Sequence, residues 1–151
     1  MAQTFVILHN VSSSSKCIDF ARVALALGFQ NIIITKASGS AATGGVPSAQ
    51  KLIAQKGGNL FYLQSLEDVK DLFELSELFI IAPPGYGKET LTDELAKEIA
   101  SVKAGIVIGG SDPGLSRKDL ESGRAVQLNL KTDPGTIGTT ALVLDKVSKY
   151  Q

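Results

Sequence analysis

The chain has 151 residues, of which 44% are hydrophobic and 20% charged, with 15 Lys+Arg balancing 15 Asp+Glu. This composition is typical of one globular domain, expected here over residues 1–151, and the zero net charge excludes a histone-like polycation and an acidic disordered tail. The single cysteine, Cys17, and the single histidine, His9, exclude an internal disulfide and a Cys/His zinc site. We expect a cytoplasmic protein without a membrane partner, because the sequence shows neither an export signal nor an anchor.

The charges are unevenly distributed along the chain. Residues 1–63 carry five bases and one acid, residues 64–98 carry three bases and nine acids, and residues 99–151 carry seven bases and five acids. The three segments therefore have net charges of +4, −6 and +2. An anionic partner would meet the two ends of the chain rather than its middle.

Short apolar runs alternate with helical patterns along the whole chain. The runs that predict strands lie at residues 5–8, 31–35, 60–63, 78–82, 106–108 and 126–130. The patterns that predict helices lie at residues 17–27, 47–55, 66–73, 90–102, 115–121 and 136–147. Strict alternation of strands and helices predicts an α/β domain with a mainly parallel sheet that is covered by helices on both faces.

Three loops rich in glycine and proline follow the last three predicted strands, at residues 82–87, 109–114 and 131–138. Ligands of parallel α/β sheets bind beyond the carboxyl ends of the strands. Glycine lets the backbone approach a ligand closely and proline stiffens the path, so these loops predict one pocket walled by main-chain groups. Two alternatives stay open: ordinary turn chemistry accounts for any one of these loops, and the polar segment 38–47 is either a substrate-contacting loop or a mobile surface connection.

Several catalytic motifs are absent from the sequence. Residues 85–90 resemble a phosphate-binding loop, but Ala82 and Glu89 stand where that motif requires glycine and a hydroxyl residue. A Ser/His/Asp triad would have to use His9, and the nearby serines at residues 12–15 are better explained as a helix cap. The acids of residues 67–77 lie on an expected solvated helix, and no Glu-x-Lys occurs, so the sequence disfavours a metal-dependent nuclease.

Four segments of the chain resemble the three motifs of a known family. Residues 21–29 read Ala-Arg-Val-Ala-Leu-Ala-Leu-Gly-Phe, and residues 106–115 read Ile-Val-Ile-Gly-Gly-Ser-Asp-Pro-Gly-Leu. Residues 126–130 and 135–138 read Val-Gln-Leu-Asn-Leu and Gly-Thr-Ile-Gly. In order, spacing and strand context, this pattern resembles the SPOUT, or α/β-knot, RNA methyltransferases, in particular their SpoU-like branch.

The resemblance implies a C-terminal trefoil knot, formed by the three loops, and a bound S-adenosylmethionine held mainly by main-chain groups. It also implies a homodimer, whose interface would bury apolar positions of the first and last helices such as Phe20 and Leu144. The residues expected to bind the cofactor are Ala82, Pro83, Pro84, Gly85, Ile108, Gly109, Gly110, Leu128, Leu130, Gly135, Thr136 and Ile137.

The activity that the resemblance implies is methyl transfer to tRNA or rRNA, at a ribose 2′-hydroxyl. Arg22 and Thr136 stand at the positions expected to be catalytic. Arg22 stays protonated, so it would grip a phosphate or polarise the hydroxyl rather than act as a base. The residues expected to contact the RNA are Lys16, Arg22, Arg117 and Lys118.

The sequence departs from the family pattern at three places. Lys16 replaces the asparagine of the first motif, Ser111 or the displaced Asp112 replaces the acid of the second, and Gly138 replaces the asparagine of the third. These departures leave open a SPOUT-like protein that binds S-adenosylmethionine or RNA without catalysing methyl transfer.

Overall fold

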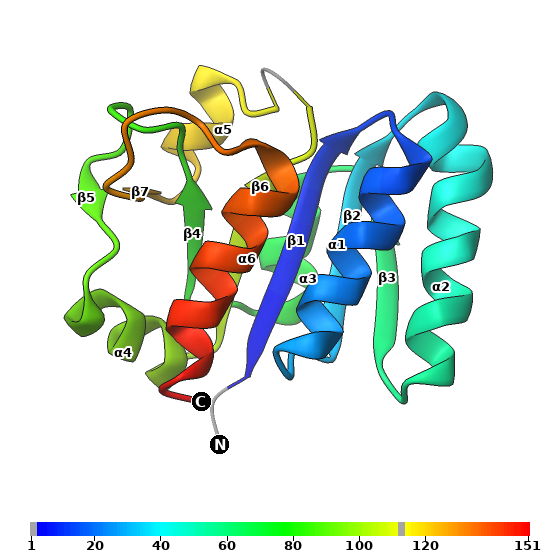
Figure 1. Ribbon diagram of the computed structural model, residues 1–151, viewed down its shortest axis with the longest axis horizontal. Coiled ribbons are helices and arrows are strands. Elements are labelled where there is room, and N and C mark those ends of the chain that lie inside the picture. Colours follow the sequence, from blue (N-terminus) through cyan, green and yellow to red (C-terminus); the bar gives the residue numbers. More distant parts are fainter. Residues whose placement is uncertain (1–2, 112–113) are drawn as a thin grey trace.

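The computed structural model describes residues 3–111 and 114–151, in which a seven-stranded sheet carries helices on both faces (Figure 1). The strands are β1 (Thr4–Val11), β2 (Asn31–Ala37), β3 (Asn59–Leu63), β4 (Glu77–Ile81), β5 (Glu89–Thr90), β6 (Ala104–Gly109) and β7 (Arg124–Gln127). Their order across the sheet is β3-β2-β1-β6-β4-β7-β5, and all neighbouring strands are parallel. The predicted α/β class is confirmed, and the trefoil knot stays a prediction.

The two faces of the sheet are covered by different helices. α1 (Ser14–Ala26), α2 (Val46–Gln55), α4 (Asp93–Ser101) and α6 (Gly135–Ser148) pack on one face, and α3 (Leu66–Phe73) and α5 (Arg117–Glu121) pack on the other. Because both faces are shielded from water, the central strands read as continuous apolar runs. Within residues 3–111 and 114–151, none of these helices combines the length and the apolar character needed to cross a membrane.

Phe20 and Leu144 lie inside the core of the single chain. Both side chains are 0% exposed and pack between the sheet and the helices of the larger face. The expectation that they form a dimer interface is wrong, because side chains that are covered within one chain have no surface left to bury against a partner. The homodimer itself stays a prediction.

Residues 38–47 are more ordered than a mobile surface connection. Ser38 N donates to Val11 O at 2.9 Å, and Ala41–Gly45 form a π-helix, η1, that leads directly into α2. A Cβ atom on Gly45 would lie 2.8 Å from the Cα of Ser14 at the start of α1. Glycine is therefore needed at position 45 because two backbones approach each other closely there.

The chain between β4 and α4 differs from the predicted helix 90–102. Glu89–Thr90 pair with β7 as the short strand β5, which occupies the expected start of the helix. The helix begins instead at Asp93, because the side chain of Thr92 caps it by accepting a hydrogen bond from Leu95 N at 3.2 Å.

Strand β7 ends earlier than the predicted strand 126–130. It ends at Gln127, whose side-chain oxygen accepts hydrogen bonds from Gly85 N at 2.9 Å and from Gly87 N at 3.0 Å. This side chain ties the loop that follows β4 to the end of β7. Residues 128–130 therefore leave the sheet and become available to line a pocket beside that loop.

Candidate functional site

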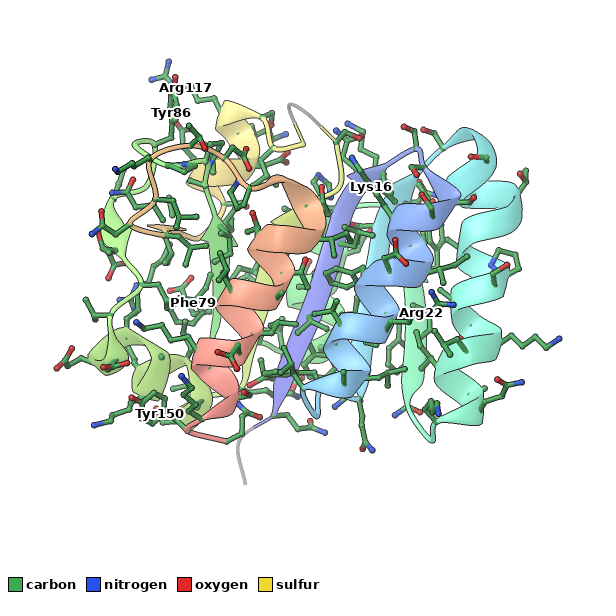
Figure 2. The ribbon with its side chains drawn as sticks, in the orientation of Figure 1. Lys16, Arg22, Phe79, Tyr86, Arg117 and Tyr150 are labelled. Atoms are coloured by element: carbon green, nitrogen blue, oxygen red, sulfur yellow. The ribbon has the colours of Figure 1, made fainter. Side chains whose placement is uncertain are left out.

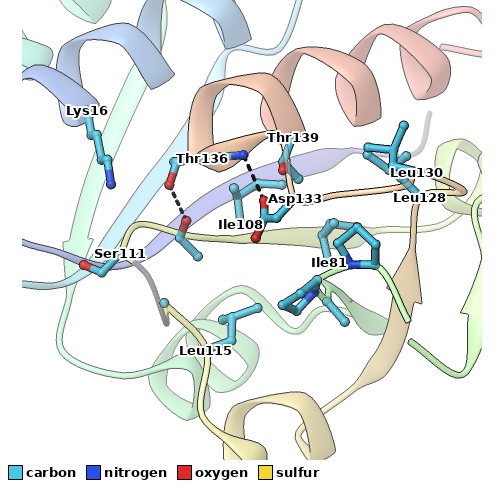
Figure 3. A pocket seen from close by; sticks show the side chains of 16 residues that line it. Lys16, Ile81, Ile108, Ser111, Leu115, Leu128, Leu130, Asp133, Thr136 and Thr139 are labelled. Atoms are coloured by element: carbon cyan, nitrogen blue, oxygen red, sulfur yellow. Dashed lines mark hydrogen bonds between the residues drawn. The ribbon is translucent and has the colours of Figure 1, made fainter. Parts of the chain in front are cut away.

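A pocket of about 210 Å³ opens where the loops that follow β4, β6 and β7 meet the start of α6 (Figure 3). We call it the loop pocket. Its lining residues are Lys16, Ile81, Ala82, Pro83, Pro84, Ile108, Gly109, Ser111, Gly114, Leu115, Leu128, Leu130, Asp133, Gly135, Thr136 and Thr139. The three glycine- and proline-rich loops thus meet at the carboxyl edge of the sheet, where ligands of parallel α/β folds bind.

The loop pocket has an apolar side and a polar side. Ile81, Leu128 and Leu130 lie together on the apolar side (Figure 3). Lys16 reaches the opposite side from α1, and its Nζ donates a hydrogen bond to Gly110 O at 3.2 Å. This arrangement suits a ligand with an apolar ring system at one end and a negative charge at the other.

The start of α6 is fixed against the loop that follows β6. Thr136 Oγ1 donates to Gly109 O at 2.9 Å, and Asp133 Oδ1 accepts from Gly135 N at 2.8 Å (Figure 3). Gly135 has a φ of +83°, which a residue with a side chain adopts only under strain. Thr136 and Asp133 therefore shape the floor of the loop pocket as well as line it.

Most residues expected to bind a cofactor line the loop pocket. Those that line it are Ala82, Pro83, Pro84, Ile108, Gly109, Leu128, Leu130, Gly135 and Thr136, and those outside its lining are Gly85, Gly110 and Ile137. Asp133 and Thr139 also line it, although no motif marked them. Asp133 could have been found, because an Asp-Pro-Gly turn directly before a helix places a carboxylate at the helix start.

The residues expected to be catalytic do not meet within one chain. Thr136 lines the loop pocket with Lys16, whereas the side chain of Arg22 is 67% exposed on α1 and pairs with Asp19 at 3.6 Å (Figure 2). Asp112, one of the two expected replacements for the family acid, lies outside the described residues. The structure therefore brings most of the expected cofactor residues together without the arginine that was expected to act beside them.

Arg117 and Lys118, the other residues expected to contact RNA, are neighbours on α5 but face different surroundings. The side chain of Arg117 is 94% exposed and pairs with Glu121 at 3.2 Å. Lys118 lines a second pocket, away from the loop pocket.

This second pocket has a volume of about 570 Å³ and lies between α3 and α5. We call it the dyad pocket, after the His9–Asp119 pair at its base. Its lining residues are His9, Lys36, Gln64, Ser65, Leu66, Glu67, Lys70, Asp71, Leu78, Ser116, Lys118, Asp119 and Ser122. No local motif marks these residues, because they come from separate strands, helices and loops.

His9, Thr35 and Asp119 form a chain of contacts from the core to the dyad pocket. His9 Nδ1 lies 2.7 Å from Thr35 Oγ1, and His9 Nε2 lies 3.3 Å from Asp119 Oδ2. His9 and Thr35 face each other because they are register partners in β1 and β2. In the neutral imidazole that donates to the carboxylate, Nε2 carries the proton and Nδ1 accepts from the threonine hydroxyl.

Both strands are strained directly after the His9–Thr35 pair. Asn10 has a φ of +63° and Lys36 a φ of +52°, in the left-handed region that side chains rarely occupy. The side chain of Asn10 donates to Gly114 O at 3.3 Å, which holds the loop after β6 in place. Residues held in such conformations cluster at functional sites.

The pKa of His9 gives the fold a pH dependence. Burial lowers this pKa below its ordinary value, and the charge of Asp119 opposes the effect without cancelling it. As the pH falls, His9 is therefore protonated in the unfolded chain before it is protonated in the folded chain. The contribution of neutral His9 to the free energy of unfolding is complete above the unfolded pKa of about 6.5. It is lost as the pH falls from there through the lower pKa of the folded chain. We expect urea denaturation to give a lower free energy of unfolding at about pH 6 than at about pH 8. His9→Gln should reduce that difference, and an unchanged pH dependence in this variant would contradict the assignment.

The fold is shared with solved methyltransferase structures. A protein from Bordetella pertussis Tohama I, described as a probable methyltransferase, matches with a TM-score of 0.81 at 13% identity, over 99% of this chain and 96% of that chain. The SpoU methyltransferase AviRb from Streptomyces viridochromogenes, in complex with AdoMet, matches with a TM-score of 0.73 at 14% identity, over 98% of this chain and 60% of that chain. At such identities the likeness establishes the fold alone, so the chain has the α/β fold of SpoU methyltransferases.

The sequence comparisons show the family of the chain. The model of the family described as RecB-family nuclease (DUF2122) matches residues 39–146, and the chain belongs to this family. A Methanocaldococcus jannaschii protein named as a candidate type II restriction enzyme, MjaORF1200P, is 27% identical over 151 residues, covering 99% of both proteins. ApeKORF2002P from Aeropyrum pernix, named in the same way, is 30% identical over 135 residues, covering 89% of this chain and 84% of the relative.

These relatives correct the function expected from the motifs. The prediction of an RNA methyltransferase is wrong, because the family is described as a nuclease family and both relatives are named as candidate type II restriction enzymes. The error has a physical origin: glycine- and proline-rich loops at the carboxyl edge of a parallel sheet follow from the fold, and one fold carries different activities.

Proposed function

We propose that the protein hydrolyses phosphodiester bonds in nucleic acid, with duplex DNA as the substrate. The observation that carries the proposal is the match to the nuclease family over residues 39–146, which is most of the chain. The two relatives named as candidate type II restriction enzymes favour DNA. RNA, the partner expected from the motif resemblance, serves as the comparison substrate.

Nucleases commonly use divalent metal ions that are held by clusters of carboxylates. Among the residues that the structure describes, no three His, Cys, Asp or Glu side chains gather into a group that could hold a metal ion. Glu67, Asp71 and Asp119 all line the dyad pocket but form no such group. The described donor set does not fit a metal centre.

The direct test of this proposal is a cleavage assay with the purified chain. We expect end-labelled duplex DNA to be cut, and RNA of the same sequence to be cut more slowly. Gel electrophoresis follows both reactions, each with and without added magnesium. A mock preparation from cells that lack the protein controls for contaminating nucleases. Failure to cut either substrate under both conditions would overturn the proposal.

The geometry of the loop pocket favours a second function, the binding of S-adenosylmethionine. Ile81, Leu128 and Leu130 would hold the adenine ring, and Lys16 would pair with the carboxylate of the methionine end. When bound, this cofactor supplies a sulfonium-activated methyl group, and the proposal concerns binding alone. The present volume of about 210 Å³ is below the roughly 300–1,000 Å³ usual for ligand pockets, so the loops would have to part on binding.

Removing the charge of Lys16 tests this second function. Lys16→Ala is expected to weaken binding of S-adenosylmethionine about 10- to 100-fold, because a hydrogen bond to a charged group contributes roughly 1.5–3 kcal/mol. Isothermal titration calorimetry measures the affinity, with Lys51→Ala on the exposed side of α2 as the matched control. Equal affinities of the two variants, or an absence of binding by the wild-type chain, would contradict the assignment.

A further inference from the structure

We propose that the dyad pocket holds the phosphate that is cleaved, and that Asp119 accepts the proton of the attacking water. This inference rests on the proposed nuclease function and assigns its reaction to a site away from the loop pocket. The volume of about 570 Å³ lies within the range usual for ligand pockets, whereas the loop pocket lies below it. The larger cavity of the two thus lies on the other face of the sheet, under α3 and α5.

The order of the three hydrogen-bonded groups decides which of them can react. In a Ser/His/Asp triad the hydroxyl faces the substrate and the carboxylate is buried. Here the order is reversed: Thr35 is 0% exposed, whereas the side chain of Asp119 is 23% exposed and lines the pocket. The group that can reach a ligand is therefore the carboxylate, a proton acceptor, and the buried hydroxyl cannot serve as the nucleophile.

Asp119 is held in place by two donors on one of its oxygens. His9 Nε2 lies 3.3 Å from Oδ2, and Ser116 N donates to the same oxygen at 2.9 Å. Within residues 3–111 and 114–151, no hydrogen bond is made to the second oxygen, Oδ1. This leaves one oxygen of a fixed carboxylate available to a water molecule in the pocket. His9 is a positioning residue in this arrangement, because it acts through Asp119.

The cations around the pocket favour a phosphate as the ligand. Lys36 lies near the carboxyl end of β2, Lys70 lies on α3 and Lys118 lies on α5, so lysines from three elements line the pocket. In the part of the chain that the structure describes, none of the three forms an ion pair with a carboxylate. Lysines without carboxylate partners are suited to the phosphates of a nucleic-acid backbone.

The acids of the pocket define where the phosphate can lie. Glu67 and Asp71 sit on α3, and Asp119 sits opposite them on α5. Lys36 lies close enough to His9 for its charge to lower the pKa of the imidazole. The phosphate is therefore expected near Lys36 and Lys118, beside Asp119 and away from the acidic side of α3.

The proposed reaction is a hydrolysis in which all atoms are accounted for. The water oxygen forms a bond to phosphorus while one proton of the water passes to Asp119. The bond between phosphorus and one sugar oxygen breaks, its electron pair stays with that oxygen, and solvent supplies the proton of the new alcohol. Asp119 then returns its proton to solvent, and no group is oxidised or reduced.

Asp119→Asn tests the proton acceptor. Asparagine retains the shape and the oxygen that accepts from Ser116 N, so the start of α5 should keep its cap. We expect kcat for cleavage of duplex DNA to fall about 100- to 10,000-fold with little change in KM, since general-base groups contribute that much. His9→Gln should also lower kcat more than it raises KM. Thermal melting of both variants verifies that they are folded.

Lys36→Asn and Lys118→Ala test the phosphate contacts. Asparagine tolerates the left-handed conformation at position 36, so this variant removes the charge without new backbone strain. Each variant is expected to weaken binding of a phosphorothioate duplex, measured by fluorescence anisotropy, and to reduce the slope of log affinity against log salt by about one. Lys51→Ala, which removes an exposed lysine of α2 on the other face of the sheet, should leave both unchanged and serves as the control.

The two experiments separate this inference from the proposed function. If the wild-type chain cleaves DNA and Asp119→Asn cleaves equally fast, the site is overturned while the nuclease function stands. If the wild-type chain cleaves nothing, the nuclease function fails, and the binding experiment decides whether the pocket holds phosphate. Equal affinity and salt slope in the two pocket variants and in Lys51→Ala would overturn the phosphate site.

Discussion

Phe79→Ala is expected to lower the free energy of unfolding by about 3–5 kcal/mol, as is usual when a fully buried phenylalanine is truncated. Phe79 lies in β4, is 0% exposed and belongs to the core on the larger helical face (Figure 2). The guanidinium of Arg124 lies 5.1 Å from the centre of its ring, so the variant also loses a cation–π contact. For a chain of this size the expected fall in Tm is about 6–20 °C, measured by circular dichroism.

Leu72→Ala is the matched control for the Phe79 variant. Leu72 is a large apolar residue on α3, but it is 62% exposed, so truncation removes little buried surface. Its free energy of unfolding should stay within about 0.5 kcal/mol of the wild-type value. Comparable losses in the two variants would contradict the placement of Phe79 in the core.

Gly123→Ala is expected to lower both stability and DNA cleavage. A Cβ atom at Gly123 would clash with the carbonyl oxygen of Leu78 and lie 2.9 Å from the Cβ of Leu78, in β4. Strand β4 is paired on both sides, to β6 and β7, so the strain is relieved by moving α5 instead. Because α5 carries Asp119 and Lys118, this movement should open the dyad pocket. We expect a loss of about 1–3 kcal/mol in the free energy of unfolding, together with reduced kcat.

Gly44→Ala separates this effect from a general cost of replacing glycine. No atom lies within 4 Å of the position that a Cβ would occupy at Gly44. Urea denaturation should therefore give a free energy of unfolding within about 0.5 kcal/mol of wild type, and cleavage should be unchanged. A Gly123→Ala protein as stable and active as Gly44→Ala would show that Gly123 does not pack against Leu78 as described.

The central part of the fold could be predicted because buried parallel strands leave a strong signal. The runs at residues 5–8 and 78–82 are continuously apolar, the run at residues 31–35 has three isoleucines at its centre, and each lies in or overlaps an observed strand. The two-residue strand β5 left no such signal, since pairing with β7 rather than residue type places it there. The expectation that Phe20 and Leu144 lie at a dimer interface failed for a related reason. Helical spacing shows that a helix has an apolar face, but it does not show whether the sheet or a second subunit covers that face.

The two pockets differ in how far the sequence revealed them. The loop pocket was predictable, because three glycine- and proline-rich segments follow neighbouring strands and must meet at one edge of the sheet. The dyad pocket was not, because His9 and Thr35 are 26 positions apart and become partners only through the register of β1 and β2. Asp119 reaches His9 from α5, which lies far along the chain, and no spacing rule predicts that contact.

The central claim is that nucleic acid binds at the dyad pocket rather than at the loop pocket. Titrating the ¹⁵N-labelled chain with a phosphorothioate duplex, and following amide chemical shifts by NMR, tests it most directly. We predict shifts concentrated at Lys36, Lys118 and Asp119. Shifts confined to the loop pocket, around residues 128–136, or spread evenly over the surface would contradict the claim.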